Sequence, residues 1–235
     1  MVRAPGEAAA SIPARHGPAL IAHMAGNTAR QVRAAIEEVA DFVEVDLWAH
    51  RGRLEARHER ALYPLPLWFE EWTTVRRAPR RPFTLAGLLA ETSGRTGVFL
   101  DLKNGRDEPA RLVRAALDSA GGFPGPLVAS SQRWGTLRGL QQLVPEAGLY
   151  YSIDVRAKLD LFRSVMERDL RPAGISCRHT LLDEGIVQEM HDRGLKVVAW
   201  TVDEPARAEE LAAWGADGIT THRVIELRSH LGLVR

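Results

Sequence analysis

Short apolar segments alternate with amphipathic segments from residue 19 onward, and this alternation restricts the possible folds more than any other feature of the chain. The apolar segments have the length of buried strands, and the amphipathic ones have the spacing of helices with one apolar face. We expect eight strands, at residues 19–23, 42–47, 98–102, 127–130, 148–153, 174–177, 196–201 and 218–221. We expect helices at residues 28–39, 85–91, 109–120, 136–143, 159–168, 184–193, 205–214 and 224–231, with Thr28 and Asp183 as N-caps.

Such alternation predicts parallel strands that are joined by helical crossovers. Eight repeats can close into a barrel without an open edge, and 235 residues suit a (β/α)8 TIM barrel, which needs about 250. An open doubly wound sheet would need a glycine-rich phosphate loop after the first strand, and residues 23–27 do not form one. We therefore predict an α/β protein with a single TIM-barrel domain.

The predicted domain spans residues 19–235, after a flexible leader at residues 1–18 that is rich in alanine, proline and glycine. A small insertion at residues 53–82 breaks the alternation. It carries the large aromatic side chains Trp68, Phe69 and Trp72. We expect these side chains to pack against the barrel, because large aromatics usually fill cores; a lid over the barrel mouth is the alternative.

The overall charge and the cysteine count exclude several classes of protein. Lysine and arginine number 31 against 30 acidic residues, and this balance gives no electrostatic reason to expect a nucleic-acid partner. The single cysteine, Cys177, cannot form an intramolecular disulfide. No apolar run reaches the length of a membrane span, and the leader lacks the apolar core of a signal peptide. We expect a cytoplasmic protein without a transmembrane segment.

Polar residues near the ends of the first three strands are the candidates for chemistry, because TIM-barrel active sites lie at those ends. Glu44 and Asp46 share one face of the second strand, and Asp101 lies on the third strand with Lys103 two residues later. Three buried carboxylates repel one another, and Lys103 alone supplies too little positive charge. A divalent cation with oxygen ligands, Mg²⁺ or Ca²⁺, would compensate them.

Two histidines could complete this site as a general acid and a general base, His23 at the end of the first strand and His58 in the insertion. Taken singly, a Glu-x-Asp pair usually forms salt bridges, and a histidine at a strand end usually has a structural role. The combination on neighbouring strands favours a catalytic site.

The same residues resemble motifs of the glycerophosphodiester phosphodiesterase family. Residues 21–23 with Asn27 and Thr28 are similar to the family's opening, and residues 43–46 resemble its Glu-x-Asp metal motif. His58 follows Glu44 by 14 residues, near the position of the family's second histidine. Further similar segments are residues 82–89, 99–103, 130–131, 196–203 and 215–220. The resemblance covers residues 19–227 and implies a barrel enzyme.

The chain departs from the family pattern at three positions. Met24 stands where the family usually has a phosphate-binding arginine, Gly26 stands where it usually has glutamate, and Asp101 replaces a glutamate ligand. His-Met near the start and Asp-x-Lys on the third strand instead resemble the related sphingomyelinase D-like phospholipases D. The resemblance therefore leaves two enzyme classes open.

The resemblance implies a metal-dependent phosphodiesterase that converts glycerophosphodiesters to glycerol 3-phosphate and an alcohol. In that function Glu44, Asp46 and Asp101 hold Mg²⁺ or Ca²⁺, Lys103 neutralises the phosphodiester, and His23 and His58 transfer protons. Trp200 either walls the substrate pocket or belongs to the core. The alternatives are a phospholipase D-like enzyme that acts on lysophospholipids or sphingolipids, in which a substrate hydroxyl can give a cyclic phosphate, and a catalytically weak phosphate-ester binding protein. The order of acid and base, the head group and the oligomeric state stay open.

Overall fold

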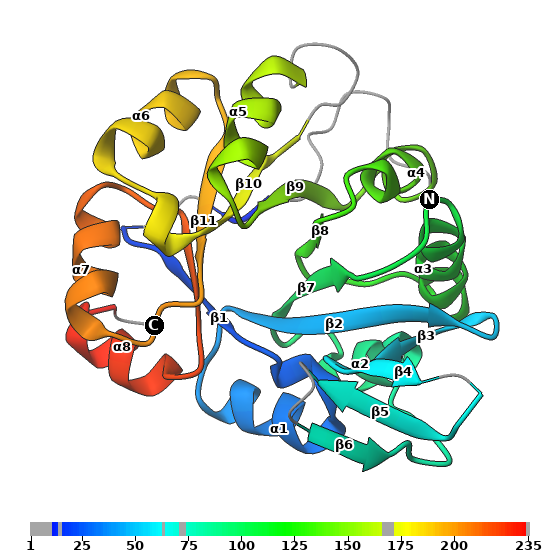
Figure 1. Cartoon of the computed structure of the whole chain (residues 1–235). Helices are drawn as coiled ribbons and strands as arrows, with labels where there is room; N and C mark the ends of the chain where they lie inside the picture. The colour runs from blue at the N-terminus through cyan, green and yellow to red at the C-terminus, as the bar shows by residue number, and fades with distance from the viewer. Residues whose placement is uncertain (1–10, 14–15, 63, 71–73, 166–171, 234–235) are drawn as a thin grey trace.

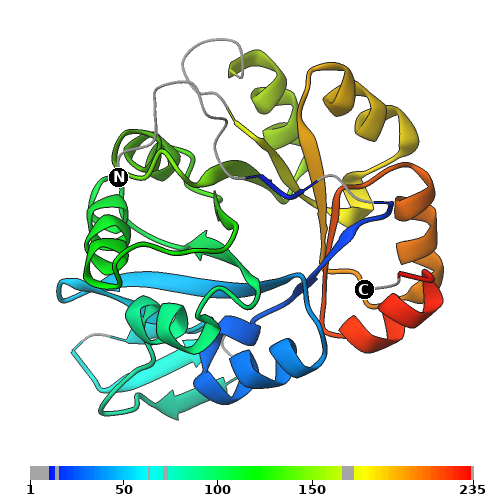
Figure 2. The ribbon, with the colours of Figure 1, turned by 180° about the vertical axis from the view of Figure 1, so that it is seen from behind.

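The chain forms a closed barrel of eight parallel strands inside a ring of helices (Figures 1 and 2). The computed structural model describes residues 11–13, 16–62, 64–70, 74–165 and 172–233. The barrel strands are β1 (Ala19–Ala22), β2 (Phe42–His50), β7 (Gly97–Leu102), β8 (Leu127–Ser131), β9 (Gly148–Ile153), β10 (Gly174–Arg178), β11 (Lys196–Trp200) and β12 (Gly218–Thr221). They pair in the order β1-β12-β11-β10-β9-β8-β7-β2, and β2 pairs back with β1. The predicted TIM barrel is confirmed, with all eight strands at the expected places.

The helices lie on the outer face of the barrel, and each apolar face packs on the strands. They are α1 (Ala29–Glu37), α2 (Leu85–Thr92), α3 (Glu108–Ser119), α4 (Gly135–Leu143), α5 (Arg156–Val165), α6 (Glu184–Asp192), α7 (Pro205–Ala213) and α8 (Val224–His230). Both expected N-caps are present, because the Thr28 hydroxyl accepts from the Gln31 N–H and the Asp183 carboxylate accepts from the Ile186 N–H. The expected last residues of α5, 166–168, lie outside the described part. Within the described residues, no helix is long and apolar enough to cross a membrane.

The insertion after β2 folds as antiparallel strands beside the barrel. Strand β3 (Arg53–Ala56) pairs with β2, and β4 (Arg60–Leu62), β5 (Leu67–Glu70) and β6 (Thr74–Arg77) form a separate three-stranded sheet. The Trp68 ring is buried, with the guanidinium carbons of Arg57 and Arg76 at 5.4 and 5.2 Å from its centre. Trp68 is therefore buried against two arginines of the insertion, whereas Trp72 lies outside the described residues.

The inward-pointing side chains of the barrel form two layers that differ in chemistry. Because side chains alternate along a strand, Phe42, Glu44 and Asp46 share the inner face of β2. The lower layer is an apolar cluster toward the N-terminal ends of the strands, formed by Ile12, Ala19, Ile21, Phe42, Phe99, Val128, Tyr150 and Val198. The upper layer, toward the C-terminal ends, is polar and includes Glu44, Asp46, Asp101, Lys103 and Ser130.

Ile12 closes the lower layer from a position inside the expected leader. Its side chain is fully buried, and its carbonyl accepts a hydrogen bond from the Lys196 ammonium group. The neighbouring Ser11 hydroxyl lies 3.2 Å from the Tyr150 hydroxyl. Residues 1–10 and 14–15 of the expected leader lie outside the described part of the chain. The described residues 11 and 12 are thus packed onto the barrel.

Candidate active site

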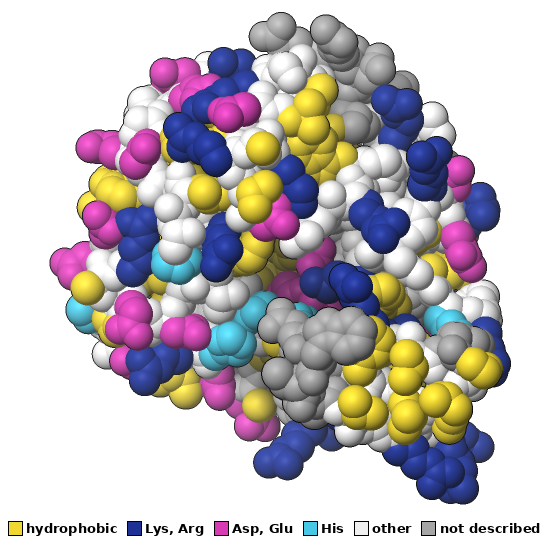
Figure 3. Space-filling model, viewed as in Figure 1, with side chains coloured by type: hydrophobic (Ala, Val, Ile, Leu, Met, Phe, Trp, Pro, Cys, Tyr) yellow, Lys and Arg dark blue, Asp and Glu magenta, His cyan; other side chains and the backbone are white. Residues whose placement is uncertain are grey.

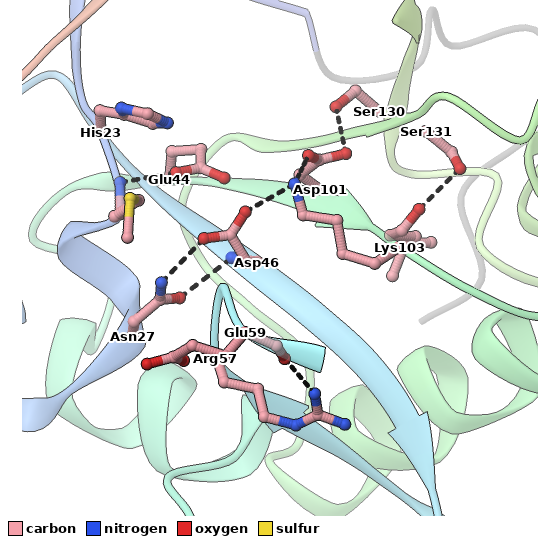
Figure 4. A network of polar contacts seen from close by, with 12 residues as sticks. His23, Asn27, Glu44, Asp46, Arg57, Glu59, Asp101, Lys103, Ser130 and Ser131 are labelled. Atoms are coloured by element: carbon pink, nitrogen blue, oxygen red, sulfur yellow. Dashed lines mark hydrogen bonds and ion pairs between the residues drawn. The ribbon is translucent and has the colours of Figure 1, made fainter. Parts of the chain in front are cut away.

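Three carboxylates meet at the upper end of the barrel interior, as the sequence predicts. Glu44 and Asp46 come from β2, and Asp101 comes from the neighbouring strand β7, where it is the register partner of Asp46. One oxygen from each of the three lies within 4.8 Å of the others. Glu44 and Asp46 are buried, and Asp101 is partly exposed. Figure 4 shows the three side chains turned toward one another.

Lys103 lies directly beside this acidic cluster. Its ammonium nitrogen is 2.7 Å from Asp46 Oδ1 and also forms an ion pair with Asp101 Oδ2. Burial alone would lower the pKa of Lys103, but the carboxylates outweigh burial and raise the pKa, so the lysine is fully charged. The Ser130 hydroxyl donates to Asp101 Oδ1 at 3.3 Å and fixes the other side of that carboxylate.

The positive charge of Lys103 does not compensate the negative charge of an ionised Glu44. Burial and the neighbouring Asp46 raise the pKa of Glu44 well above its ordinary value. Its Oε2 atom accepts a hydrogen bond from the Met24 backbone N–H at 2.6 Å. The cluster thus contains more negative charge than its protein neighbours neutralise. Three carboxylates that converge in this way suit a hard divalent cation, so the residues present fit the implied metal.

A short segment after β1 clamps Asp46 from the side. The 3-10 helix η1 (Ala25–Asn27) places the Asn27 amide so that Nδ2 donates to Asp46 Oδ2 at 2.8 Å and Oδ1 accepts from the Asp46 N–H at 3.0 Å. Burial alone would raise the pKa of Asp46, but Lys103 and Asn27 together hold it below its ordinary value. Asp46 is therefore ionised and held in one orientation.

Two of the departures from the family pattern lie in this segment. Met24 has a left-handed backbone with φ of 55°, which directs its N–H toward Glu44. A Cβ atom at Gly26 would lie 2.5 Å from Val45 Cβ and 2.8 Å from the Glu44 carbonyl oxygen. Glycine is required there because η1 packs directly on β2, and a glutamate would not fit.

His23 follows β1 and lies next to the carboxylates. Figure 4 shows its ring extending across the space beside Glu44. Burial, with a smaller contribution from the nearby His222, lowers the pKa of His23 to about 4, so its ring is neutral at pH 7. Its Nδ1 lies 2.9 Å from His222 Nε2 and 3.4 Å from the Thr201 hydroxyl. A neutral histidine in this place is suited to accept a proton.

His58 reaches the same region from the insertion. The preceding Arg57 anchors this turn, because its N–H donates to the Asp46 carbonyl at 2.9 Å and its guanidinium pairs with Glu55 at 3.3 Å. His58 is close enough to act electrostatically on both His23 and Asp46. The structure therefore brings both predicted histidines to the acidic cluster.

A cavity of about 960 Å³ opens beside these residues. Its lining includes Trp48, His58, Phe69, Asp101, Lys103 and Arg133. Figure 3 shows acidic side chains at the bottom of a hollow in the middle of this face, with basic side chains beside them. The cavity leads from the solvent to the acidic cluster.

Trp200, the remaining predicted site residue, ends β11 at the same end of the barrel. Its indole N–H is buried and has no hydrogen-bond partner among the described residues. It is not part of the lining of the cavity beside His58 and Lys103. The sequence did not single out Asn27, Asp203 or His222 as site residues, although Asn27 and Asp203 belong to segments that resemble the family. For His222, the available signal was its place directly after the last strand.

Comparisons with known proteins agree with this fold. A chain from the Oleispira antarctica phosphodiesterase structure, in complex with the product sn-glycerol-3-phosphate, superposes with a TM-score of 0.74 at 20% identity, over 92% of this chain and 97% of that one. A glycerophosphodiester phosphodiesterase of Thermotoga maritima gives a TM-score of 0.70 at 18% identity, over 92% and 99%. One of Parabacteroides distasonis gives 0.70 at 18% identity, over 92% and 97%. No curated protein matches the sequence.

A family model also matches the sequence itself. The glycerophosphoryl diester phosphodiesterase family model matches residues 107–226, which is half of the 235-residue chain. The matched range begins after Asp101, so the three carboxylates and both histidines lie in the part that the model does not match. They nonetheless lie near the C-terminal ends of the strands, the end at which the active sites of TIM-barrel enzymes are found. By its sequence, this chain belongs to the glycerophosphoryl diester phosphodiesterase family and is an enzyme of that family.

Proposed function

We propose that this enzyme hydrolyses glycerophosphodiesters to glycerol 3-phosphate and an alcohol at the upper end of the barrel. The observation that carries the proposal is the meeting of three carboxylates, one charged lysine and two histidines beside one open cavity. Binding of a phosphate ester alone would need cationic groups but no neutral histidine. The arrangement therefore favours catalysis over simple binding.

Glu44, Asp46 and Asp101 would hold a divalent cation, Mg²⁺ or Ca²⁺. Such a cation, when bound, polarises a phosphoryl oxygen and stabilises the charge that develops in the transition state. Lys103 is held by Asp46 and Asp101 at the wall of the cavity, where its ammonium group can bind another phosphate oxygen. This lysine supplies positive charge in a chain that has Met24 in place of the phosphate-binding arginine.

His23 and His58 would move the protons. A phosphodiester bound at Lys103 would lie beside His58, which lines the cavity, and His23 would approach from the first strand. One histidine removes the proton of the attacking hydroxyl group or water, and the other protonates the leaving alcohol oxygen.

The family and one relative support this substrate class. The Oleispira antarctica phosphodiesterase was captured with sn-glycerol-3-phosphate, which is described as its product. A small glycerophosphate-type molecule suits a cavity of about 960 Å³ at the end of a barrel.

Assays of glycerophosphocholine and lysophosphatidylcholine, with and without a chelator, test this function. We expect glycerol 3-phosphate from the first substrate, and we expect chelation to abolish its release once bound metal has been removed. Turnover of lysophosphatidylcholine alone, with lysophosphatidic acid or its cyclic phosphate as product, would reassign the enzyme to the phospholipase D-like class. Binding of glycerophosphocholine without any turnover would reduce the protein to a phosphate-ester binding protein.

A further inference from the structure

A chain of three side chains runs from the acidic cluster to the protein surface through His23. His23 Nδ1 lies 2.9 Å from His222 Nε2, and His222 Nδ1 lies 2.9 Å from Asp203 Oδ2. The two imidazole rings are tilted against each other with centroids 4.6 Å apart. His222 follows β12 and is half exposed, and Asp203 follows β11. The pair therefore contacts His23 through its Nδ1 atom.

Asp203 acts only as an acceptor in this chain. Its Oδ1 accepts from the Thr221 hydroxyl at 3.0 Å and from the His222 backbone N–H at 2.8 Å. Burial alone would raise the pKa of Asp203, but these hydrogen bonds and the His222 ring outweigh burial and hold the pKa below its ordinary range. Asp203 is therefore an ionised carboxylate, and Oδ2 requires a proton on His222 Nδ1.

The position of the proton on His222 determines where the proton of His23 lies. A neutral imidazole has one N–H donor and one bare nitrogen, so a neutral His222 with its proton on Nδ1 presents a bare Nε2. The His23 nitrogen that faces it must then be the donor, which places the single proton of neutral His23 on Nδ1. Nε2 of His23, at the far end of the ring, is left without a proton.

We infer that His222 and Asp203 are positioning residues that hold His23 as the tautomer with a bare Nε2, and that His23 is for this reason the general base of the reaction. The inference rests on the proposed function and assigns the two histidine roles within it. When Nε2 removes the proton of the nucleophile, the imidazolium of His23 keeps its Nδ1–H directed at His222 Nε2. His58 is then the group that donates a proton to the leaving oxygen.

The tautomer can be measured without any substrate. In protein with ¹⁵N-labelled histidine, two-bond ¹⁵N–¹H correlations distinguish protonated from bare ring nitrogens. We expect a protonated Nδ1 and a bare Nε2 for His23 at pH 7, and we expect Nε2 to become protonated in His222→Phe. A protonated His23 Nε2 in the wild-type enzyme would overturn the inference, whatever the enzyme's substrate proves to be.

Kinetics of three variants test the consequence for catalysis. Loss of a side chain that orients a functional histidine typically costs about 10- to 100-fold, so we expect His222→Phe to lower kcat by this factor with little change in KM. His222→Gln should recover most of the rate, because its Oε1 can accept the His23 Nδ1–H. His230→Phe is the matched control, since His230 pairs with Glu209 at 3.2 Å on the outer surface and should leave kcat unchanged.

The variant Asp203→Asn tests the inference independently. Its carbonyl oxygen must still accept from the His222 backbone N–H, so the amide NH₂ faces His222 Nδ1 and forces the His222 proton onto Nε2. His23 is then forced into the tautomer that carries its proton on Nε2. We expect kcat to fall as far as in His222→Phe, and we expect no further loss when the two substitutions are combined. Unchanged kcat in folded His222→Phe, with melting temperature as in wild type, would remove the pair from the mechanism.

Discussion

The lower and upper layers of the barrel interior are built by the same strands with the same side-chain period, but they meet opposite requirements. In the lower layer Phe42 and Phe99 are almost completely buried among apolar neighbours, and Ile12 closes the end. In the upper layer, two residues further along β2 and β7, Glu44 and Asp101 repel each other. The fold is thus stabilised at one end of each strand, and this stability permits an unfavourable charge cluster at the other.

The comparison predicts that substitutions in the upper layer affect the rate and substitutions in the lower layer affect stability. The largest effect should come from Asp46→Asn, which neutralises a proposed metal ligand that also pairs with Lys103 and Asn27. We expect kcat/KM to fall by about 10⁴-fold, equivalent to several kcal/mol of transition-state stabilisation. Steady-state assays at saturating divalent cation measure this, with Phe99→Leu as a lower-layer control that keeps its rate. A fully active Asp46→Asn enzyme would show that the cluster is not catalytic.

The next largest effect concerns the two histidines. His23→Ala and His58→Ala should each lower kcat by about 10²–10⁴-fold, because each removes one proton transfer. The double variant should be little worse than the poorer single variant, since base and acid act in one transition state. Melting temperatures of the same samples serve as the control. Variants that lose thermal stability but keep their rate per folded molecule would assign these histidines to packing.

Phe42→Ala tests the lower layer in the opposite sense. Truncation of a buried phenylalanine removes apolar contacts and leaves a cavity, so the free energy of unfolding should fall by about 3–5 kcal/mol. Activity per folded molecule should stay within a few-fold of wild type at low temperature. Denaturant titration measures the loss. A rate that falls in proportion to stability would mean that the two layers are not separate in function.

The smallest effect should be a gain in stability. Because the pKa of Glu44 is raised in the folded state, its contribution to stability is present below its ordinary pKa and is lost as the pH rises through the raised value. In chelator, Glu44→Gln should therefore melt a few degrees above wild type, on the order of 1 kcal/mol, and more so at pH 8 than at pH 5. Added Mg²⁺ or Ca²⁺ should stabilise wild type and abolish the difference. A lower melting temperature for the variant at pH 8 would contradict the proposed repulsion.

The sequence predicts the barrel well because each strand is an apolar run between helix signals. It also predicts the carboxylates, because period-two spacing on neighbouring strands is visible in Glu44, Asp46 and Asp101. The three-stranded sheet β4-β5-β6 was not predicted, since Pro64 and Pro66 interrupt any alternation there.

The other unpredicted contacts depend on residues that are far apart in the sequence. Ile12 packs near Tyr150, which is 138 residues away, although the sequence on either side of Ile12 is typical of a mobile leader. His222 meets His23 only because β12 is the neighbour of β1 in the closed barrel, 199 residues apart. Closure follows from the predicted fold, but which side chains then touch depends on the stagger of the strands, which apolar patterns do not specify.

The pairing of β1 with β12 also has a consequence for biosynthesis. During translation, His23 leaves the ribosome well before its ring partner at position 222 and the strand that positions it, because 199 residues separate the two histidines. A nascent chain that already contains all three carboxylates and both proposed catalytic histidines still lacks the support for one of them. We therefore expect that the site matures only when β12 has paired with β1, so that chains interrupted before this strand act on phosphodiesters far more slowly than the complete barrel.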